Sequence, residues 1–447
     1  MNIKSDSRKI VNGDTFIALH YINDGHQYIE DAINRGATKI IAEHGLYSVD
    51  TLIVDDTHEY LVKYLKDNYY DEIKDLKIIG MTGTNGKTTT CYLIHKVLNE
   101  LGEKCAYIGT IGFYINEKIK DLNNTTPDIL DIYEMLMVAK NEGCKYVVME
   151  VSSHALALDR VKGLEFDYAI FSNLTEDHLD YHKNMDSYLK EKQKLFKILK
   201  NKKVAILNKD SNYFDDFLFD NYNISYGFKD SDYMITDYNI SINGSYFVIN
   251  DIEHYETKLI GKHNIYNLLC VIIILKEIGY NYEKIKEIIS NVECPRGRME
   301  RIDYEDNLII VDYAHTPDAV ENVIKTVKEL KPNNIYTIIG CGGNRDKKKR
   351  PIMGNIATKL SNYVIFTSDN PRYEDPNSII GDIVSGVDTN NYEIEINRQK
   401  AIVRGIQLLN KNDILLVLGK GHETYQIIEN KKIDMDDKEI ILNSIRR

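Results

Sequence analysis

Tryptophan is absent from the sequence, and cysteine and proline are scarce, with 6 and 7 residues among 447. The cysteines are spread along the chain without a C-x-x-C pair, at positions 91, 105, 144, 270, 294 and 341. This scatter argues against a disulfide framework and against a zinc site, and it is typical of reduced thiols. We therefore give the cysteines no functional role.

Long apolar runs are also missing. The longest covers residues 268–275, far short of the roughly 20 residues that a membrane-spanning helix needs. The first residues, M-N-I-K-S-D, lack the apolar region of a secretory signal. We therefore expect a cytoplasmic protein that does not enter a membrane.

Positive charge is the minority charge. The sequence has 56 Lys and Arg against 68 Asp and Glu, which gives a net charge of -12. Nonspecific binding to nucleic acid depends on neutralising many phosphates, so this balance argues against a nucleic-acid partner. An anionic small molecule can still bind wherever a pocket gathers positive groups. At roughly 150 residues per domain, the length predicts about three domains.

From residue 77 onward, short β-rich runs alternate with helical ones, which predicts an α/β fold built on parallel sheets. The expected strands are residues 77–81, 146–151, 168–171 and 204–208. A stretch rich in tyrosine and asparagine, residues 212–258, breaks the rhythm and favours antiparallel strands. Helical periodicity resumes at residues 264–279, and the run C-P-R-G at 294–297 indicates a linker.

Four expected strands after that linker each end in a polar cluster. They cover residues 308–312, 335–340, 363–367 and 414–418. Ligands of open α/β sheets bind beyond the carboxyl ends of the strands. The four clusters together therefore predict a binding site at this edge.

The run G-T-N-G-K-T-T-T, residues 83–90, follows an expected strand and begins an expected helix. A glycine-rich loop in this place lets backbone N–H groups surround a phosphate, while Lys87 reaches the terminal phosphates and Thr88 offers a hydroxyl to Mg²⁺. The spacing departs from the strict P-loop, since Met81 stands five positions before Gly86. The run predicts ATP binding.

Two further clusters carry acids and histidines. Glu150 ends an expected strand in M-E-V-S-S-H, where its carboxylate is either a ligand of a hard cation or a buried structural group. The run N-L-T-E-D-H-L-D-Y-H, residues 173–182, places His178 between Asp177 and Asp180. A solvated turn is the alternative interpretation of this run.

The helix expected next has an apolar stripe at i, i+3 and i+4 spacing, formed by Met185, Tyr188, Leu189, Leu195, Phe196 and Leu199. Lys192 falls on this stripe. Desolvation disfavours an inward ammonium, and a neutral amine reacts with CO₂ to form a carbamate that can ligate a metal. From periodicity alone, a lysine that extends its charge to solvent is the favoured alternative.

The motifs together, in this order, resemble the Mur ligases of peptidoglycan synthesis, and within them the members that add the third residue to UDP-N-acetylmuramoyl-L-alanyl-D-glutamate. The resemblance covers nearly the whole chain. It is carried by D-S-R at 6–8, G-T-N-G-K-T-T-T at 83–90, N-T-T-P at 124–127, M-E-V-S-S-H-A-L at 149–156, N-L-T-E-D-H-L-D-Y-H at 173–182, G-K-H-N-I-Y-N at 261–267, G-R-M-E at 297–300, V-D-Y-A-H-T-P-D-A at 311–319 and G-K-G-H-E at 419–423.

This resemblance implies three domains: a small mixed UDP-binding domain over residues 1–75, a central P-loop-type ATPase over 76–294, and a Rossmann-like amino-acid-binding domain over 295–447. It also implies a reaction in which ATP phosphorylates a carboxylate and an amine attacks the acyl phosphate. ATP and Mg²⁺ are the implied cofactors. We expect a monomer whose partners are its small-molecule substrates.

The resemblance assigns roles residue by residue. The catalytic residues are Lys87, Glu150, His178 and Lys192, and the metal ligands are Thr88, Glu150, His178 and Lys192 as its carbamate. ATP is expected to contact Gly83, Thr84, Asn85, Gly86, Lys87, Thr88, Thr89, Asn264, Arg298, Asp312 and His315. The UDP-substrate is expected to contact Ser7, Asn124, Thr125, Thr126, Ser152 and Arg160. Leu158 stands where members of the family often carry glutamine, which puts one substrate contact in doubt.

The run S-D-N-P-R-Y-E-D at 368–375 decides which amino acid is expected, because D-N-P-R resembles the members that add meso-diaminopimelate. Diaminopimelate carries a second carboxylate that lysine lacks, and a guanidinium grips a carboxylate bidentately. The residues implied to bind it are Arg345, Asp369, Asn370, Pro371, Arg372, Gly419 and Glu423.

Three alternatives stay open. A lysine-adding ligase of the same fold is disfavoured by Arg372 and Glu423. A folylpolyglutamate synthase shares the ligation chemistry, but H-L-D-Y-H and G-K-G-H-E argue against it. A non-catalytic nucleotide-binding or scaffold protein would be expected to lose at least one of the four catalytic residues, and all are present.

Overall fold

The computed structural model describes residues 1–20, 24–177 and 179–446, and for residues 179, 180 and 201–203 it describes the backbone alone. The chain divides into two compact units, Met1–Tyr233 and Met234–Arg447. The division into three domains expected from the sequence stays a prediction. No helix of the described residues combines the length and the apolar character needed to cross a bilayer.

The first unit begins with a small sheet of four parallel strands in the order β1-β2-β3-β4. Its strands are β1 (Ile3–Lys4), β2 (Thr15–Ile17), β3 (Lys39–Ala42) and β4 (Asp50–Ile53). Its helices are η1 (Ser7–Lys9), η2 (Gly25–Tyr28), α1 (Ile29–Asn34) and α2 (Thr57–Ile73). Phe16, Ile29 and Ile40 are fully buried between them, so this region has a core of its own.

The part of the larger sheet that the first unit contains has the order β12-β11-β10-β5-β9-β6-β7-β8. Its strands are β5 (Lys77–Thr82), β6 (Cys105–Gly109), β7 (Gly112–Tyr114), β8 (Lys118–Lys120), β9 (Tyr146–Glu150), β10 (Phe166–Phe171), β11 (Leu199–Asn208) and β12 (Tyr222–Gly227). The helices between them are α3 (Lys87–Glu100), α4 (Ile129–Asn141), α5 (Ser153–Ala157), α6 (Leu179–His182), α7 (Met185–Lys197) and η3 (Asp215–Phe217). The strands from β12 to β6 are parallel, which confirms the α/β prediction.

One strand in this sheet corrects the sequence-based prediction. The stretch 212–258 was expected to be antiparallel, but β12 pairs in parallel with β11. The connection between them contains η3 and returns the chain to the starting end of the sheet, so a parallel partner becomes available. Alternating residues indicate a strand but not its direction.

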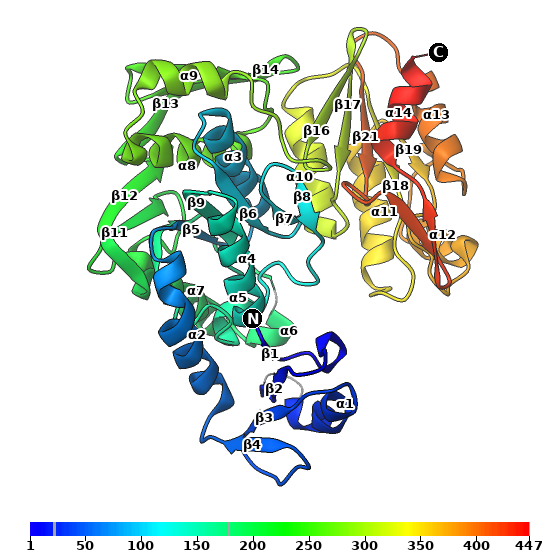
Figure 1. The fold of residues 1–447 in the computed structure, drawn as a ribbon. Helices are drawn as coiled ribbons and strands as arrows, with labels where there is room; N and C mark the ends of the chain where they lie inside the picture. The colour runs from blue at the N-terminus through cyan, green and yellow to red at the C-terminus, as the bar shows by residue number, and fades with distance from the viewer. Residues whose placement is uncertain (21–23, 178, 447) are drawn as a thin grey trace. The chain divides into compact units, whose positions relative to one another are not determined.

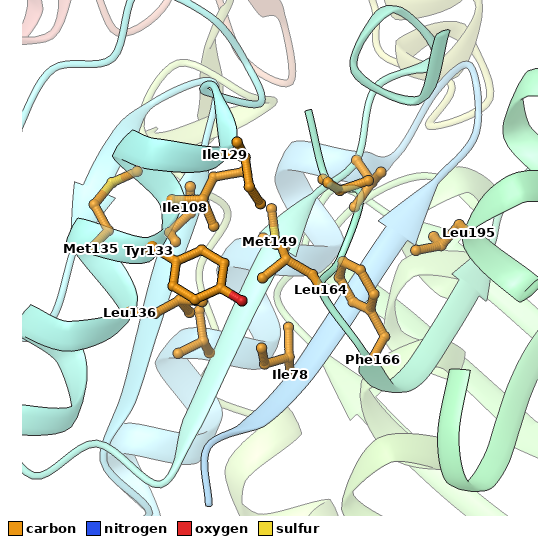
Figure 2. Close-up of a cluster of buried hydrophobic side chains, with 14 of the residues drawn as sticks. Ile78, Ile108, Ile129, Tyr133, Met135, Leu136, Met149, Leu164, Phe166 and Leu195 are labelled. Carbon is orange, nitrogen blue, oxygen red and sulfur yellow. The ribbon is translucent and has the colours of Figure 1, made fainter. Parts of the chain in front are cut away.

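The core of the first unit lies between the sheet and the helices packed against it (Figure 2). Ile78 and Met149 come from adjacent strands, and Tyr133 from α4 packs in the same cluster. Each side chain of this size contributes about 1.5–3 kcal/mol when fully buried. Gly80 leaves room for the Phe166 ring of β10 and for α7, because a Cβ there would lie 2.6 Å from that ring and 3.1 Å from Leu195 Cδ1.

The second unit contains an antiparallel meander followed by two helices. The elements are β13 (Tyr233–Ser241), β14 (Gly244–Ile249), β15 (Glu253–Thr257), α8 (Lys262–Ile278) and α9 (Tyr282–Ile289). The three strands pair antiparallel, β13 with β14 and β14 with β15, as the sequence predicts for this part of the tyrosine-rich stretch.

The rest of the second unit is a six-stranded sheet in the order β16-β17-β21-β18-β19-β20, in which β16 alone is antiparallel (Figure 1). The strands are β16 (Glu300–Tyr304), β17 (Asn307–Asp312), β18 (Ile335–Ile339), β19 (Tyr363–Phe366), β20 (Tyr392–Ile394) and β21 (Ile414–Leu418), beside the hairpin β22 (Tyr425–Ile428) and β23 (Lys431–Asp434). The helices are α10 (Pro317–Lys328), α11 (Lys349–Leu360), α12 (Pro376–Val384), α13 (Arg398–Leu408) and α14 (Asp437–Ile445).

Helices cover both faces of this sheet. Along β17, Leu308 and Ile310 face the cluster that contains α10, α11 and α12, whereas Ile309 and Val311 face the cluster with α13 and α14. The four strands expected after the linker are all present and parallel. Their carboxyl ends therefore meet at one edge, and that edge carries the polar clusters.

Candidate active site

The glycine-rich loop joins β5 to α3. Gly83 has φ of +148° and Gly86 has φ of +90°, both in the region that favours glycine. A Cβ on Gly83 would lie 2.0 Å from Ser172 Oγ. The loop thus depends on glycine both for its turn and for its close approach to the end of β10. Because α3 begins at Lys87, the free N–H groups of its first turn can bind an anion.

The loop is held by the segment that follows β10, the strand next to β5. Thr84 N donates to Asn173 O at 2.9 Å, and Asn85 N donates to Asn173 Oδ1 at 3.0 Å. Ser172 Oγ donates to Asn85 O at 2.6 Å. Asn173 begins the acid- and histidine-rich run of the sequence, so the structure gives the start of that run a role in shaping the phosphate loop.

Lys87 and Thr88 lie at the start of α3. The Lys87 ammonium donates to Gly83 O at 2.7 Å and to Thr84 O at 2.9 Å. The Thr88 hydroxyl donates to Glu150 Oε2 at 2.9 Å. The glycine-rich loop with its lysine and the acid, which were predicted from two separate motifs, therefore come together.

Glu150 is 1% exposed and is surrounded by donors. The Tyr107 hydroxyl and the Thr110 N–H, the latter at 2.9 Å, donate to Oε1, and Thr110 Oγ1 donates to Oε2 at 3.2 Å. Burial, together with the charge of Glu150, raises the pKa of Tyr107 well above its usual value, so this phenol stays a donor. Tyr107 and Thr110 were not found from the sequence, because neither lies in a recognisable motif.

Lys192 lies on the apolar stripe of α7, and 1% of its surface is exposed, so its whole side chain is buried. Its Nζ donates to Gly83 O at 2.8 Å and lies 4.5 Å from the centre of the Tyr188 ring. No carboxylate within the described part of the chain forms an ion pair with it. Desolvation, and after it the nearby charge of Lys87, holds the pKa of Lys192 well below its usual value. A lysine that extends its charge to solvent is therefore the wrong interpretation.

Some of the residues expected to bind the UDP-substrate connect to Glu150 and Thr110. Thr125 Oγ1 is 3.1 Å from Thr110 Oγ1, and Thr126 Oγ1 donates to the Glu150 carbonyl at 2.8 Å. Arg160 Nη1 donates to Thr126 O at 3.1 Å.

The other residues of this set are more dispersed. Ser152 N donates to Thr126 Oγ1 at 3.0 Å, and the Ser152 hydroxyl caps α5. Asn124 is exposed in the loop before Thr125, and Ser7 is buried in η1 beside the small N-terminal sheet. Leu158 forms the C-cap of α5.

The expected metal site is described only in part, because His178 lies outside the described residues. Among the residues that the structure does describe, no group of three or more His, Cys, Asp or Glu side chains converges as a metal site. Thr88 and Glu150 supply adjacent oxygen atoms 2.9 Å apart. Magnesium takes oxygen ligands and is usually bound by one or two carboxylates with substrate phosphates and waters, so this small oxygen set fits it.

In the second unit, three of the expected ATP residues lie together. The Arg298 guanidinium lies 5.0 Å from the centre of the Tyr313 ring, and His315 Nδ1 is 2.8 Å from Tyr313 O. Asp312 accepts from Met299 N at 2.7 Å. Burial raises the pKa of Asp312 and lowers that of His315. The fourth, Asn264, lies buried on α8, where its side chain donates to Ile260 O at 2.8 Å.

The residues expected to bind the amino acid come from the ends of β18, β19 and β21. Asn370 Nδ2 donates to Glu423 Oε2 at 2.7 Å, and Arg372 Nη1 donates to Gly343 O at 2.9 Å. A Cβ on Gly419 would lie 2.6 Å from Asp369 Oδ2. Arg345 is exposed on the loop after β18.

Lys420 joins this cluster although no role was assigned to it from the sequence. Its side chain is fully buried, and Nζ donates to Glu423 Oε2 at 3.2 Å and to Asn370 Oδ1 at 3.3 Å. Asp369 is buried nearby, and desolvation raises its pKa. The signal for Lys420 was present in G-K-G-H-E, but its inward orientation depends on the turn after β21.

The fold and this site define an α/β protein with a P-loop-like glycine-rich loop between β5 and α3. A model of the Mur ligase middle domain matches residues 81–275, and one described as "Mur ligase, glutamate ligase domain" matches residues 297–421. The chain belongs to the Mur ligase family.

A relative from Fusobacterium nucleatum is 43% identical, over 100% of this chain and 94% of its own length. A relative from Clostridium perfringens is 41% identical, over 98% of this chain and 94% of its own. Both are named UDP-N-acetylmuramoyl-L-alanyl-D-glutamate–2,6-diaminopimelate ligase. A solved structure of a ligase with the same name is 33% identical, covers 99% of this chain and 94% of its own, and superposes with a TM-score of 0.73.

Proposed function

We propose that this protein is an ATP-dependent amide ligase that adds meso-2,6-diaminopimelate to UDP-N-acetylmuramoyl-L-alanyl-D-glutamate through an acyl phosphate. The observation that carries this proposal is the position of Glu150. The side-chain oxygen Oε2 of this residue accepts from Thr88 at the start of α3, while its backbone carbonyl accepts from Thr126 of the expected substrate segment. A phosphate donor and a carboxylate acceptor bound to these two segments would meet.

The reaction needs such a site because a carboxylate is a poor electrophile until one of its oxygens becomes a leaving group. Bringing it against a triphosphate also requires positive charge to offset the repulsion between anions. Lys87 supplies a cation at the mouth of the loop, 2.7 Å from Gly83 O. Mg²⁺ held by Thr88 and Glu150 would supply further charge to the transferred phosphoryl group.

Lys192 supports the proposal in a second way. Its buried amine is unpaired by any described carboxylate, and its lowered pKa favours the neutral form that reacts with CO₂. In that reaction the Nζ lone pair forms a bond to carbon, a proton leaves, and a carbamate anion results. The modified side chain would place a carboxylate beside the phosphate loop, where it can bind a metal ion. His178 stays a predicted partner in this site.

The choice of amino acid rests on the arginines at the edge of the C-terminal sheet and on the relatives' names. Arg372 Nη1 donates to Asn370 O at 3.4 Å, and the side-chain amide of Asn370 donates to Glu423 Oε2 at 2.7 Å. A guanidinium can grip the distal carboxylate of diaminopimelate, and Glu423 can accept from its distal ammonium. A buried polar site left unpaired by lysine discriminates strongly against it.

The testing experiment measures phosphate release from ATP with UDP-N-acetylmuramoyl-L-alanyl-D-glutamate and either meso-diaminopimelate or L-lysine. We expect the wild type to prefer diaminopimelate strongly. Arg372→Ala should remove most of this preference, mainly by raising the KM for diaminopimelate. Equal wild-type rates with both amino acids would refute the substrate assignment, and no phosphate release with either would refute the ligase activity.

Asn264, Arg298, Asp312 and His315 stay predicted contacts of ATP. A monomer in the cytoplasm, without a nucleic-acid partner, also stays a prediction from composition and resemblance.

A further inference from the structure

A buried arginine on α11 joins two loops at the edge of the C-terminal sheet. The Arg350 side chain is 0% exposed. It binds Glu374 in fork geometry, with Nη1 to Oε2 at 2.9 Å and Nη2 to Oε1 at 3.0 Å. Nη2 also donates to Gly342 O at 3.1 Å. One guanidinium therefore binds the loop after β19, through Glu374, and the loop after β18, through Gly342.

Glu374 extends the same connection. It lies two residues after Arg372 and accepts the backbone N–H of Asn344, the residue before Arg345. Lys347 Nζ lies 3.2 Å from its Oε2. The side chain of one loop thus binds the backbone of the other, next to each of the two arginines that are expected to read the amino acid.

Further bonds run between the loops. Gly343 N donates to Asn370 O at 2.9 Å, and Tyr373 N donates to Asn344 Oδ1 at 3.1 Å. A Cβ on Gly343 would lie 1.9 Å from Pro371 O, so the two backbones are in contact.

Both loops contain strained backbone beside the arginines. Arg372 has φ of +51° and Asn344 has φ of +53°, in the left-handed region. Residues other than glycine adopt this conformation at a cost in free energy and keep it only where surrounding contacts enforce it. The Glu374 carboxylate accepts the Asn344 N–H on one side. On the other side, Arg372 N donates to Ile427 O at 3.0 Å and Arg372 O accepts from Glu429 N at 2.7 Å, so the hairpin of β22 and β23 also holds this backbone, next to the loop that Glu374 fixes.

We propose that Arg350 and Glu374 are positioning residues for amino-acid selection: they hold Arg345 and Arg372 in the geometry that recognises a second, distal carboxylate. The proposal rests on the proposed function, because it concerns the same pocket. Bidentate recognition of a carboxylate requires fixed guanidinium groups, and misplacing a binding group by about 1 Å costs up to about 100-fold. L-Lysine has no distal carboxylate, so its binding should not change when the two guanidinium groups are misplaced.

The competing explanation is that the Arg350–Glu374 pair only stabilises the fold and has no part in positioning the two arginines. Asp382 provides a matched control for this explanation. Arg350 Nη1 also donates to Asp382 Oδ2 of α12 at 2.9 Å. Asp382→Asn weakens the same buried guanidinium network without removing a contact to either loop. A variant that only loosens the fold should behave like Asp382→Asn.

The experiment measures kcat and KM for diaminopimelate and for L-lysine, the KM for ATP, and the melting temperature. The variants are Glu374→Gln, Arg350→Lys, Glu374→Asp and Asp382→Asn. We expect Glu374→Gln and Arg350→Lys to raise the KM for diaminopimelate about 10- to 100-fold, with kcat and the KM for ATP within about twofold. Their kcat/KM for L-lysine should stay unchanged, so discrimination falls by the same factor. Glu374→Asp keeps the negative charge, so it should retain part of the discrimination between diaminopimelate and L-lysine.

The outcomes separate the two proposals. The first outcome is that the wild type prefers diaminopimelate and Glu374→Gln keeps that preference, while its melting temperature falls as that of Asp382→Asn does. This outcome refutes the positioning role and leaves the proposed substrate standing. If the wild type shows no preference, the proposed substrate is refuted, and this inference with it. Because Glu374 is 15% exposed, Glu374→Gln provides the decisive measurement even if Arg350→Lys does not fold.

Discussion

At the scale of single residues, Glu150 carries the most direct prediction. Glu150→Gln keeps the shape of the side chain but removes the charge that accepts from Thr88 and Thr110. We expect kcat to fall about 100- to 1,000-fold, the loss typical of removing one electrostatic contact to a transition state. Phosphate release checks this. The control Glu117→Gln, at an exposed position, should leave the rate unchanged. A Glu150→Gln enzyme with wild-type kcat would contradict the proposed mechanism.

Lys192 allows a sharper test, because charge and carbamate can be separated. We expect Lys192→Ala and Lys192→Arg both to lose about 100-fold or more in kcat, since arginine keeps the positive charge but cannot form the carbamate. Short carboxylates such as acetate, added to Lys192→Ala, should restore part of the activity. Lys190→Ala, an exposed lysine of the same helix, is the control. Full activity in Lys192→Arg would show that the ammonium itself is the functional group.

Hydrophobic periodicity predicts which face of a helix is buried, but not what a side chain on that face contacts. Lys192 was placed on the buried stripe of its helix from i, i+3 and i+4 spacing, and it is 1% exposed. What it meets there, the Gly83 carbonyl, comes from a segment 109 residues away. Spacing along one helix contains no information about such a partner.

At the scale of elements, the turn from β5 to α3 is the feature that should tolerate substitution least, because Gly83 has no room for a side chain. Gly83→Ala would place a Cβ 2.0 Å from Ser172 Oγ at a φ of +148°. We expect the free energy of unfolding to fall by about 1–3 kcal/mol, and ATP binding to weaken because the loop must move. Denaturant unfolding and nucleotide titration check both effects.

Gly381→Ala is the control for that substitution. Gly381 lies inside α12 with nothing within 4 Å of its added Cβ. Alanine there should raise the free energy of unfolding by about 0.5–1 kcal/mol. If Gly83→Ala were as stable as the wild type, the close approach of the loop to Ser172 would not constrain it.

Elements differ in how well the sequence predicts them. The four parallel strands of the C-terminal sheet were expected because each is an apolar run ending in a polar cluster. The antiparallel direction predicted for β12 was wrong, because the direction of a strand depends on where the connection through η3 returns the chain. Periodicity reports burial on each face, and it is the same for both directions.

At the scale of the whole molecule, acid stability should report the Arg350–Glu374 pair. The hydrogen bonds from Arg350, and after them the one from Asn344, lower the pKa of Glu374 from 4.5 to about 2. A carboxyl with a lower pKa in the folded state stabilises the fold above its unfolded pKa, and this contribution is lost as the pH falls through the folded value. The window therefore runs from about pH 4.5 down to about pH 2.

Denaturant unfolding of the wild type and Glu374→Gln across this window gives the measurement. We expect the difference in unfolding free energy between them to be constant above the window and to shrink within it. A difference that does not change with pH would show that the Glu374 charge does not contribute to the stability of the fold.

By itself, the sequence determined the α/β class, the glycine-rich loop between a strand and a helix, the place of Lys192 on the buried stripe of its helix and the family, because these depend on residue types at short spacing and on the order of motifs. Only the tertiary structure decided which groups meet: Thr88 with Glu150, Lys192 with the Gly83 carbonyl, and Lys420 with Asn370 and Glu423. It also revealed Arg350 and Glu374 as a connection between two loops. The reason is physical, since such contacts depend on strand order and on the path of each turn, which bring together side chains far apart in the chain.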